Sequence, residues 1–235
     1  MKLVSFGCSF IYGNDLHDCN TNFAKNVFGS LDPGFYEGRS SNLTWPALVA
    51  KDLGLVYECR AEGGSGNLKI LDQIIENAHT NPDSIYIINW TWIDRFSYVN
   101  SEGDTWHNIL PSSSENNAKL YYRNFHSTYT DKLNTLLYIK SAIDLLTSKN
   151  IPYVMTYVDP LMLESVHHVS PTIKFLQEFV KPLLTTFDGL SFLEWSSKNN
   201  FIISNNLHPL EDAHCAAADN QLPIIISRIQ NIIDR

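Results

Sequence analysis

The sequence predicts a three-layer α/β domain, in which helices cover both faces of a parallel sheet. Short apolar runs rich in β-branched and aromatic residues alternate with longer segments of helical periodicity. The chain has 235 residues, 44% of them hydrophobic and 18% charged, which is enough to bury a sizeable core. Since no internal repeat or linker divides the chain, we expect a single domain over residues 1–235.

Each expected element follows from a local pattern. Five apolar runs predict strands, at residues 2–6, 55–59, 84–90, 151–158 and 190–195. Helical periodicity predicts helices at residues 45–53, 68–79, 118–149, 170–187 and 212–233. Two polar, turn-rich segments, 14–42 and 100–117, predict long loops, the first with a short helix around residues 23–28.

Charge and cysteine content exclude several classes of function. There are 17 Lys and Arg against 25 Asp and Glu, a formal net charge of -8, and no run of like charges. This balance argues against a nucleic-acid partner or an acidic membrane surface. The four cysteines form no CxxC pair, and no apolar run approaches the length of a membrane span. We therefore expect a soluble, cytoplasmic protein with reduced thiols and no metal site.

Residues suited to chemistry follow the predicted strands. In an open parallel sheet, ligands bind beyond the carboxyl ends of the strands. The first strand is followed by GCS (residues 7–9), the second by AEGGSGN (61–67) and the third by TWIDR (91–95), while NNLHPLEDAH (205–214) precedes the last helix. We expect these segments to gather at one edge of the sheet.

Ser9 and His208 predict nucleophilic catalysis. A serine hydroxyl attacks an acyl carbonyl only when a base takes its proton and N–H donors hold the oxyanion. Ser9 would be the nucleophile and His208 the base, with the backbone N–H groups of Ser9 and Gly66, and Asn67 nearby, as the oxyanion hole. Cys8 is the alternative nucleophile, but side-chain alternation points it toward the sheet when Ser9 faces the cleft.

These segments resemble the motifs of the SGNH, or GDSL-type, hydrolases. The Gly-Asp-Ser block is similar to Gly7-Cys8-Ser9, the oxyanion glycine to Gly66 in GGSGN, and the Asp-x-x-His-Pro block to residues 205–209. The resemblance implies a flavodoxin-like sandwich with a five-stranded parallel sheet. It also implies an esterase that acts without metal or cofactor.

Three positions depart from the family pattern. Cys8 replaces the Asp of the first block. The third block lacks a clear Gly-x-Asn-Asp, and Thr91 is the polar residue closest to its oxyanion position. Asn205 stands where the family has its Asp. Since an amide can orient an imidazole but cannot stabilise an imidazolium, we expect a Ser-His dyad, a Ser-His-Asn arrangement, or an acid supplied from elsewhere.

Neighbouring residues have structural interpretations. Ser9 alone would more often cap a helix, and His208 alone would more often lie on the surface. We interpret His214 as structural and Trp92 as a wall of the cleft, and we expect an Asp94–Arg95 ion pair to fix the loop after the third strand.

The favoured function is hydrolysis of a short acyl ester on a small molecule or glycan, with a carbohydrate O-acetyl group as one candidate. One alternative is a catalytically weakened domain that binds a glycan or a protein. A third hypothesis is acyl transfer to a sugar, which would use the same residues and exclude water from the acyl-enzyme.

Overall fold

Four parallel strands form the central sheet of the computed structural model, which describes residues 1–19, 40–103 and 105–233. They run in the order β2 (Val56–Cys59), β1 (Lys2–Phe6), β3 (Ser84–Trp90) and β6 (Tyr153–Tyr157). Every residue of β3 is buried, as expected for a central strand covered on both faces. From β1 the chain connects to β2 on one side, and from β2 it crosses back to β3 on the other side of β1. Ligands of such sheets bind in the crevice at the carboxyl ends of the two strands where this change of side occurs, here β1 and β3.

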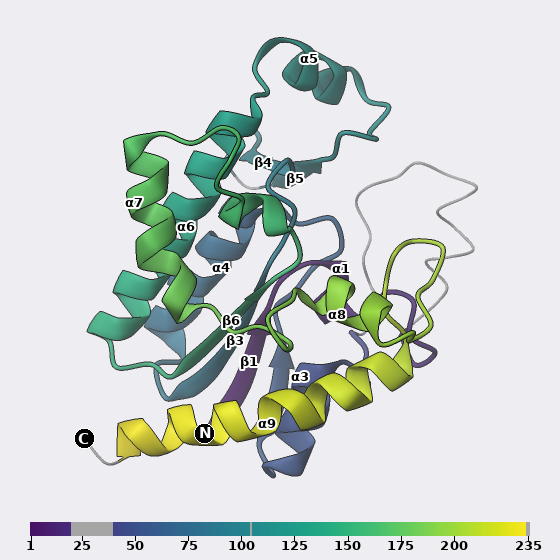
Figure 1. Ribbon diagram of the computed structural model, residues 1–235, viewed down its shortest axis with the longest axis vertical. Coiled ribbons are helices and arrows are strands. Elements are labelled where there is room, and N and C mark those ends of the chain that lie inside the picture. Colours follow the sequence, from purple (N-terminus) through teal and green to yellow (C-terminus); the bar gives the residue numbers. More distant parts are fainter. Residues whose placement is uncertain (20–39, 104, 234–235) are drawn as a thin grey trace.

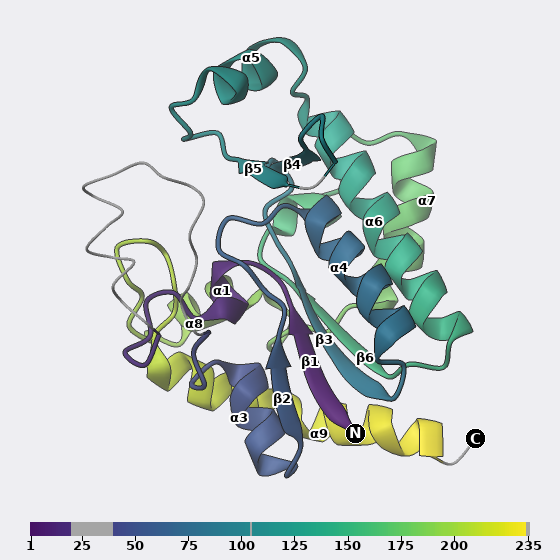
Figure 2. The ribbon, with the colours of Figure 1, turned by 180° about the vertical axis from the view of Figure 1, so that it is seen from behind.

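Helices cover both faces of this sheet (Figures 1 and 2). One layer contains α4 (Asn67–Thr80), α6 (Thr128–Ser148) and α7 (Pro171–Val180). The other contains α3 (Trp45–Asp52), α8 (Phe192–Lys198) and α9 (Glu211–Ile233). The predicted fold class, a three-layer α/β sandwich around a parallel sheet, is confirmed.

Side-chain alternation along β1 divides the core in two. Val4 and Phe6 pack into the cluster under α4, α6 and α7, whereas Leu3 packs into the cluster under α3, α8 and α9. The register pairs Val4 with Glu58 of β2 and Lys2 with Val56, so these β2 side chains face the α4 layer. Val56 is 64% exposed, which shows that α4 leaves this edge of the sheet uncovered.

The predicted fifth strand, residues 190–195, is wrong. Ser191 and Glu194 form a reciprocal capping box that starts α8 at Phe192. Beside β6, the N–H of Thr185 donates to the carbonyl of Met155, and the segment then forms only an isolated bridge between Phe187 and Leu190. The sheet therefore has four strands in the described part of the chain.

Two of the predicted helices are interrupted or end earlier than expected. Residues 118–149 form two helices, α5 (Asn116–Asn124) and α6, because the Ser127 hydroxyl accepts the N–H of Thr130 and caps the second. Residues 170–187 form α7, and a 3-10 turn, η2 (Lys181–Leu183), then contains a proline. A second 3-10 turn, η1 (Pro160–Leu163), follows β6.

The predicted loop 100–117 contains a strand. β5 (Trp106–Ile109) pairs antiparallel with β4 (Phe96–Val99), and this hairpin leads into α5 (Figure 1). Of the other predicted loop, residues 14–19 form turns and bends. The short helix expected at residues 23–28 lies outside the described residues.

Candidate active site

Ser9 begins the single-turn helix α1 (Ser9–Tyr12) three residues beyond the end of β1. Its side chain lies at the carboxyl edge of the sheet and the residue is only 5% exposed. Cys8 is fully buried in the core under α3 and α9. The turn thus directs the serine, and not the cysteine, toward the site.

His208 reaches Ser9 from a tight turn between α8 and α9. Its Nε2 lies 2.8 Å from the Ser9 Oγ. The N–H of Ser204 donates to the His208 carbonyl at 2.8 Å and closes this turn. The edge of the imidazole packs against Phe10, with ring centroids 5.2 Å apart. Backbone and ring contacts together fix the direction of the imidazole.

Asp15 completes a chain of hydrogen bonds through His208. Its Oδ2 lies 2.8 Å from the His208 Nδ1. Asp15 returns to the site because α1 ends at Gly13, whose φ of 80° is left-handed. A Cβ on Gly13 would lie 2.5 Å from the Ser41 Cβ, so the reversal requires glycine.

The position that we predicted for Asn205 is therefore occupied by Asp15. Asn205 is exposed, and no hydrogen bond joins its side chain to His208 in the described part of the chain. Two neighbours on the same turn hold the Asp15 carboxylate instead: the Ser204 hydroxyl donates to it, and so does the Asn206 amide at 3.2 Å. The acid comes from the loop after α1 rather than from the histidine turn.

The electrostatics of the pair suit a neutral base beside an ionised acid. Burial favours the protonated acid at Asp15, but hydrogen bonds from Ser204 and His208 outweigh it and hold the pKa of Asp15 below its ordinary value. Burial lowers the pKa of His208, partly offset by the Asp15 contact. Because an ionised Asp15 can only accept, Nδ1 carries the proton and Nε2 is free to accept from the Ser9 hydroxyl.

Two of the expected oxyanion donors, Gly66 and Asn67, are engaged elsewhere. The Gly66 N–H donates to the Ser97 Oγ at 3.0 Å. The Asn67 amide donates to the Thr91 carbonyl and the Thr135 hydroxyl, at 3.3 and 3.1 Å. Its Oδ1 accepts the Thr91 N–H at 2.9 Å. These bonds tie α4 to β4, to the end of β3 and to α6, and engage the whole side-chain amide of Asn67.

The loop after β3 differs from expectation at two positions. Thr91 is fully buried, and its hydroxyl has no partner among the described residues. The expected Asp94–Arg95 ion pair does not form within the same part of the chain; the Arg95 Nη1 is buried and without a partner there. Trp92 is half-buried and packs against the core under α3 and α9.

Sequence reasoning missed Asp15 and Ser204 as parts of this site. The sequence shows a glycine two residues before an acid, just after the serine turn, but this pattern does not indicate that the acid reaches His208. His214, by contrast, is buried in α9 with its Nδ1 accepting the Trp45 N–H at 3.1 Å, away from the Ser9 hydroxyl.

Membrane-spanning helices and metal-binding clusters are both absent from the described residues. No helix there is both long and apolar enough to cross a bilayer. Nor do three or more His, Cys, Asp or Glu side chains of these residues gather as a metal-binding group.

Comparison with known proteins supports a fold assignment. The sequence matches no family profile and no curated protein sequence. Solved structures do match. A lipolytic protein of the G-D-S-L family from Veillonella parvula is 12% identical, with a TM-score of 0.50 over 95% of this chain and 97% of that one. A catalytic mutant of an acetylxylan esterase from Geobacillus stearothermophilus is 13% identical, with a TM-score of 0.51 over 95% and 93%. This chain therefore has the fold of the SGNH (GDSL-type) hydrolases, as its motifs predicted.

Proposed function

We propose that the protein is a serine ester hydrolase that removes a short acyl group. The observation that carries the proposal is the unbroken chain from the Ser9 Oγ to the His208 Nε2, and from its Nδ1 to Asp15, with both contacts at 2.8 Å. A hydroxyl, a neutral imidazole and an ionised carboxylate in this order are the arrangement that activates a serine. The expected Ser-His dyad thus becomes a proposed Ser-His-Asp triad.

The reaction follows from the direction of these hydrogen bonds. As the Ser9 Oγ attacks the acyl carbonyl, its proton passes to the His208 Nε2, and Asp15 stabilises the imidazolium. The imidazolium then protonates the departing alkoxide, which leaves as the alcohol, and the acyl group remains on Ser9. Water attacks this ester with His208 again as base, releasing the carboxylic acid and restoring the serine.

The oxyanion needs donors other than Asn67. The Ser9 N–H belongs to the first turn of α1, where backbone N–H groups have no partner within the helix. Arg95 is the second donor that we propose. Burial is the main effect that lowers the pKa of His208, and the Arg95 charge lowers it further by a smaller amount. The Arg95 Nη1 is buried and has no partner among the described residues. The Gly66 N–H would add a third donor if Ser97 released it.

Ester hydrolysis by alanine variants tests the triad. We expect wild-type protein to hydrolyse p-nitrophenyl acetate and butyrate, with kcat falling on the order of 10³-fold or more in Ser9→Ala and His208→Ala. Unfolding curves should show that both variants remain folded. Equal near-background rates in all three would contradict the proposal and favour the alternative, a domain that binds a glycan or protein without catalysis.

A further inference from the structure

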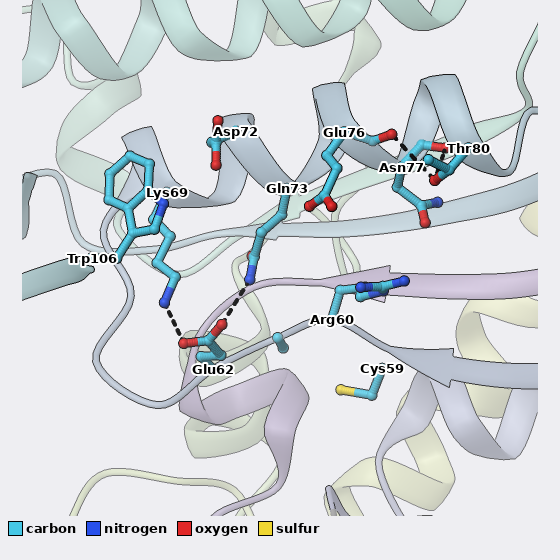
Figure 3. Close-up of a pocket in the computed structure, with 11 residues that line it drawn as sticks. Cys59, Arg60, Glu62, Lys69, Asp72, Gln73, Glu76, Asn77, Thr80 and Trp106 are labelled. Carbon is cyan, nitrogen blue, oxygen red and sulfur yellow. Dashed lines mark hydrogen bonds and ion pairs between the residues drawn. The ribbon is translucent and has the colours of Figure 1, made fainter. Parts of the chain in front are cut away.

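A cavity of about 330 Å³ lies between α4 and the chain that leaves β2. Figure 3 shows its lining: α4 supplies one wall, residues 59–62 supply the other, and the Trp106 indole of β5 lies at one end beside Lys69. This volume is within the range of small-molecule sites. None of its lining residues has been given a role in the Ser9 chemistry.

The cavity exists because α4 does not cover β2. The β2 side chains that face the α4 layer are Val56 and Glu58, and neither belongs to the apolar core under α4. Across the cavity from residues 59–62, α4 presents six lining residues spaced at helical intervals, Lys69, Asp72, Gln73, Glu76, Asn77 and Thr80. The twelve residues from Lys69 to Thr80 span about 16 Å of helix, so the cavity is an elongated groove.

Hydrogen-bonded polar groups line one part of this groove. The Glu62 carboxylate accepts from both the Lys69 ammonium and the Gln73 amide, the latter at 3.0 Å (Figure 3). The Lys69 side chain is only 10% exposed. The Gln73 Oε1 is buried and has no partner among the described residues. An acceptor of this kind is costly to bury unless a ligand or water donates to it.

The lining favours a neutral ligand rich in hydroxyl groups. Both cations are already paired, Lys69 with Glu62 and Arg60 with Glu58, so an anion finds little free positive charge. The carboxylates of Asp72 and Glu76 belong to exposed residues, where water screens their attraction for a cation. Amide and carboxylate groups bind hydroxyls, and a half-buried indole offers a flat face to the apolar side of a sugar ring.

The groove adjoins the loop that carries Ser9. The N–H of Glu62 donates to the Gly7 carbonyl at 3.2 Å, and the N–H of Arg60 donates to the Ser5 carbonyl at 2.8 Å. We propose that this groove binds the neutral sugar chain of a carbohydrate ester whose acyl group reaches Ser9. The claim that the acyl group reaches Ser9 rests on the proposed esterase function. The claim that the groove binds a sugar chain does not depend on that function.

Binding is tested on the full chain carrying Ser9→Ala, which cannot turn over an ester. The probes are xylotetraose and cellotetraose, and the readout is the indole N–H signals of the protein in ¹⁵N-labelled form, with Trp106 assigned by Trp106→Phe. We expect a saturable shift of the Trp106 signal with at least one probe, and no such shift of the Trp195 signal, because Trp195 is buried against Phe187. A Trp106 signal unmoved by both sugars overturns the proposal.

Kinetics link the groove to the ester site. With an O-acetylated form of the sugar that binds, we expect Trp106→Ala and Gln73→Ala each to raise KM about tenfold, and Trp106→Phe to recover part of the loss. Rates on p-nitrophenyl acetate, which has no sugar, should stay unchanged in all three variants. Phe125→Ala, which removes an exposed aromatic side chain just after α5, is the matched control.

The two proposals fail in different ways. If the Trp106 signal responds to a sugar but wild type and Ser9→Ala hydrolyse no ester, the esterase function is overturned and the groove remains a sugar site. If esters are hydrolysed but Trp106→Ala affects sugar esters and p-nitrophenyl acetate equally, the groove does not bind substrate, and the inference is overturned.

Discussion

Asp15 is separated from His208 by 193 positions, yet it is the carboxylate that contacts the imidazole. An Asp15→Asn substitution keeps the shape but removes the charge, and the amide can present N–H to Nδ1, which favours the wrong tautomer. We therefore expect kcat to fall by about 10² to 10⁴-fold with KM little changed. Steady-state hydrolysis of p-nitrophenyl acetate measures kcat and KM separately and so tests this prediction.

Asn205 provides the matched control for that prediction. Asn205→Asp restores the residue that the SGNH motif has at this position, but the side chain is exposed and does not contact His208. Neither Asn205→Asp nor Asn205→Ala should change kcat. A large fall of kcat in Asn205→Ala together with a normal kcat in Asp15→Asn would show that Asn205, and not Asp15, orients His208.

The protonation of His208 sets the pH dependence of the reaction. Burial lowers its pKa below the ordinary 6.5, and Asp15 raises it in part. Because the base must be neutral, kcat/KM should rise with pH to a plateau, with a midpoint below 6.5. Asp15→Asn removes the raising contribution, so its midpoint should move to still lower pH even as the rate falls. A midpoint that moved upward would show that Asp15 does not act on His208.

Gly66 joins two elements at the start of α4. An added Cβ would lie 2.5 Å from the Ser97 Oγ and 2.8 Å from the Arg95 carbonyl, and that backbone atom cannot move cheaply. We expect Gly66→Ala to lower the free energy of unfolding by about 1–3 kcal/mol, measured by urea denaturation.

Ser65→Ala is the control for Gly66→Ala. Ser65 is equally buried, but its hydroxyl has no partner in the described part of the chain, so its removal should cost little. If the two variants unfolded at the same urea concentration, α4 would not be packed against β4 at Gly66 as the structure describes.

Helices and strands could be predicted from the sequence where burial or a cap leaves a local pattern in the residues. Strands such as β3 were predicted because an unbroken apolar run is itself the consequence of burial on both faces. Residues 190–195 were apolar enough for a strand, but the Ser191–Glu194 capping box is a local signal for a helix and decided the outcome. The β4–β5 hairpin was missed because each strand has only four residues and only one fully buried position, which is too short a run to show a pattern.

The site was predictable only as far as its motifs are local. Ser9 and His208 stand in short motifs tied to strand ends, and the structure brings them together. The Asp15 contact depends on how the chain turns at Gly13 and on the position of the Ser204 turn, which no short pattern encodes. The oxyanion assignment failed at Asn67 for a similar reason, since its partners Thr91 and Thr135 lie on other elements.

Across the whole molecule, one buried histidine joins the two helices that close the sheet face opposite α4. His214 of α9 is 2% exposed, and its Nδ1 accepts the N–H of Trp45, the first residue of α3. Its ring lies 4.9 Å from that of Phe192. A protonated Nδ1 could not accept this bond, so the packing of α3 against α9 requires the neutral imidazole.

This requirement makes the stability of the fold depend on pH. Burial lowers the pKa of His214 from 6.5 to about 3, so below pH 6.5 the unfolded chain gains a proton that the folded chain does not. The contribution of neutral His214 to the free energy of unfolding is complete above pH 6.5 and is lost as the pH falls toward 3. Near pH 5 the free energy of unfolding is lower by about 2 kcal/mol for this reason. In His214→Asn the amide oxygen can accept the Trp45 N–H without titrating. We therefore expect the free energy of unfolding, measured by urea denaturation, to fall between pH 7 and pH 5 by about 2 kcal/mol more in the wild type than in His214→Asn. Equal losses in the two proteins would mean that α3 and α9 stay packed around a charged histidine, which is incompatible with the hydrogen bond to Trp45.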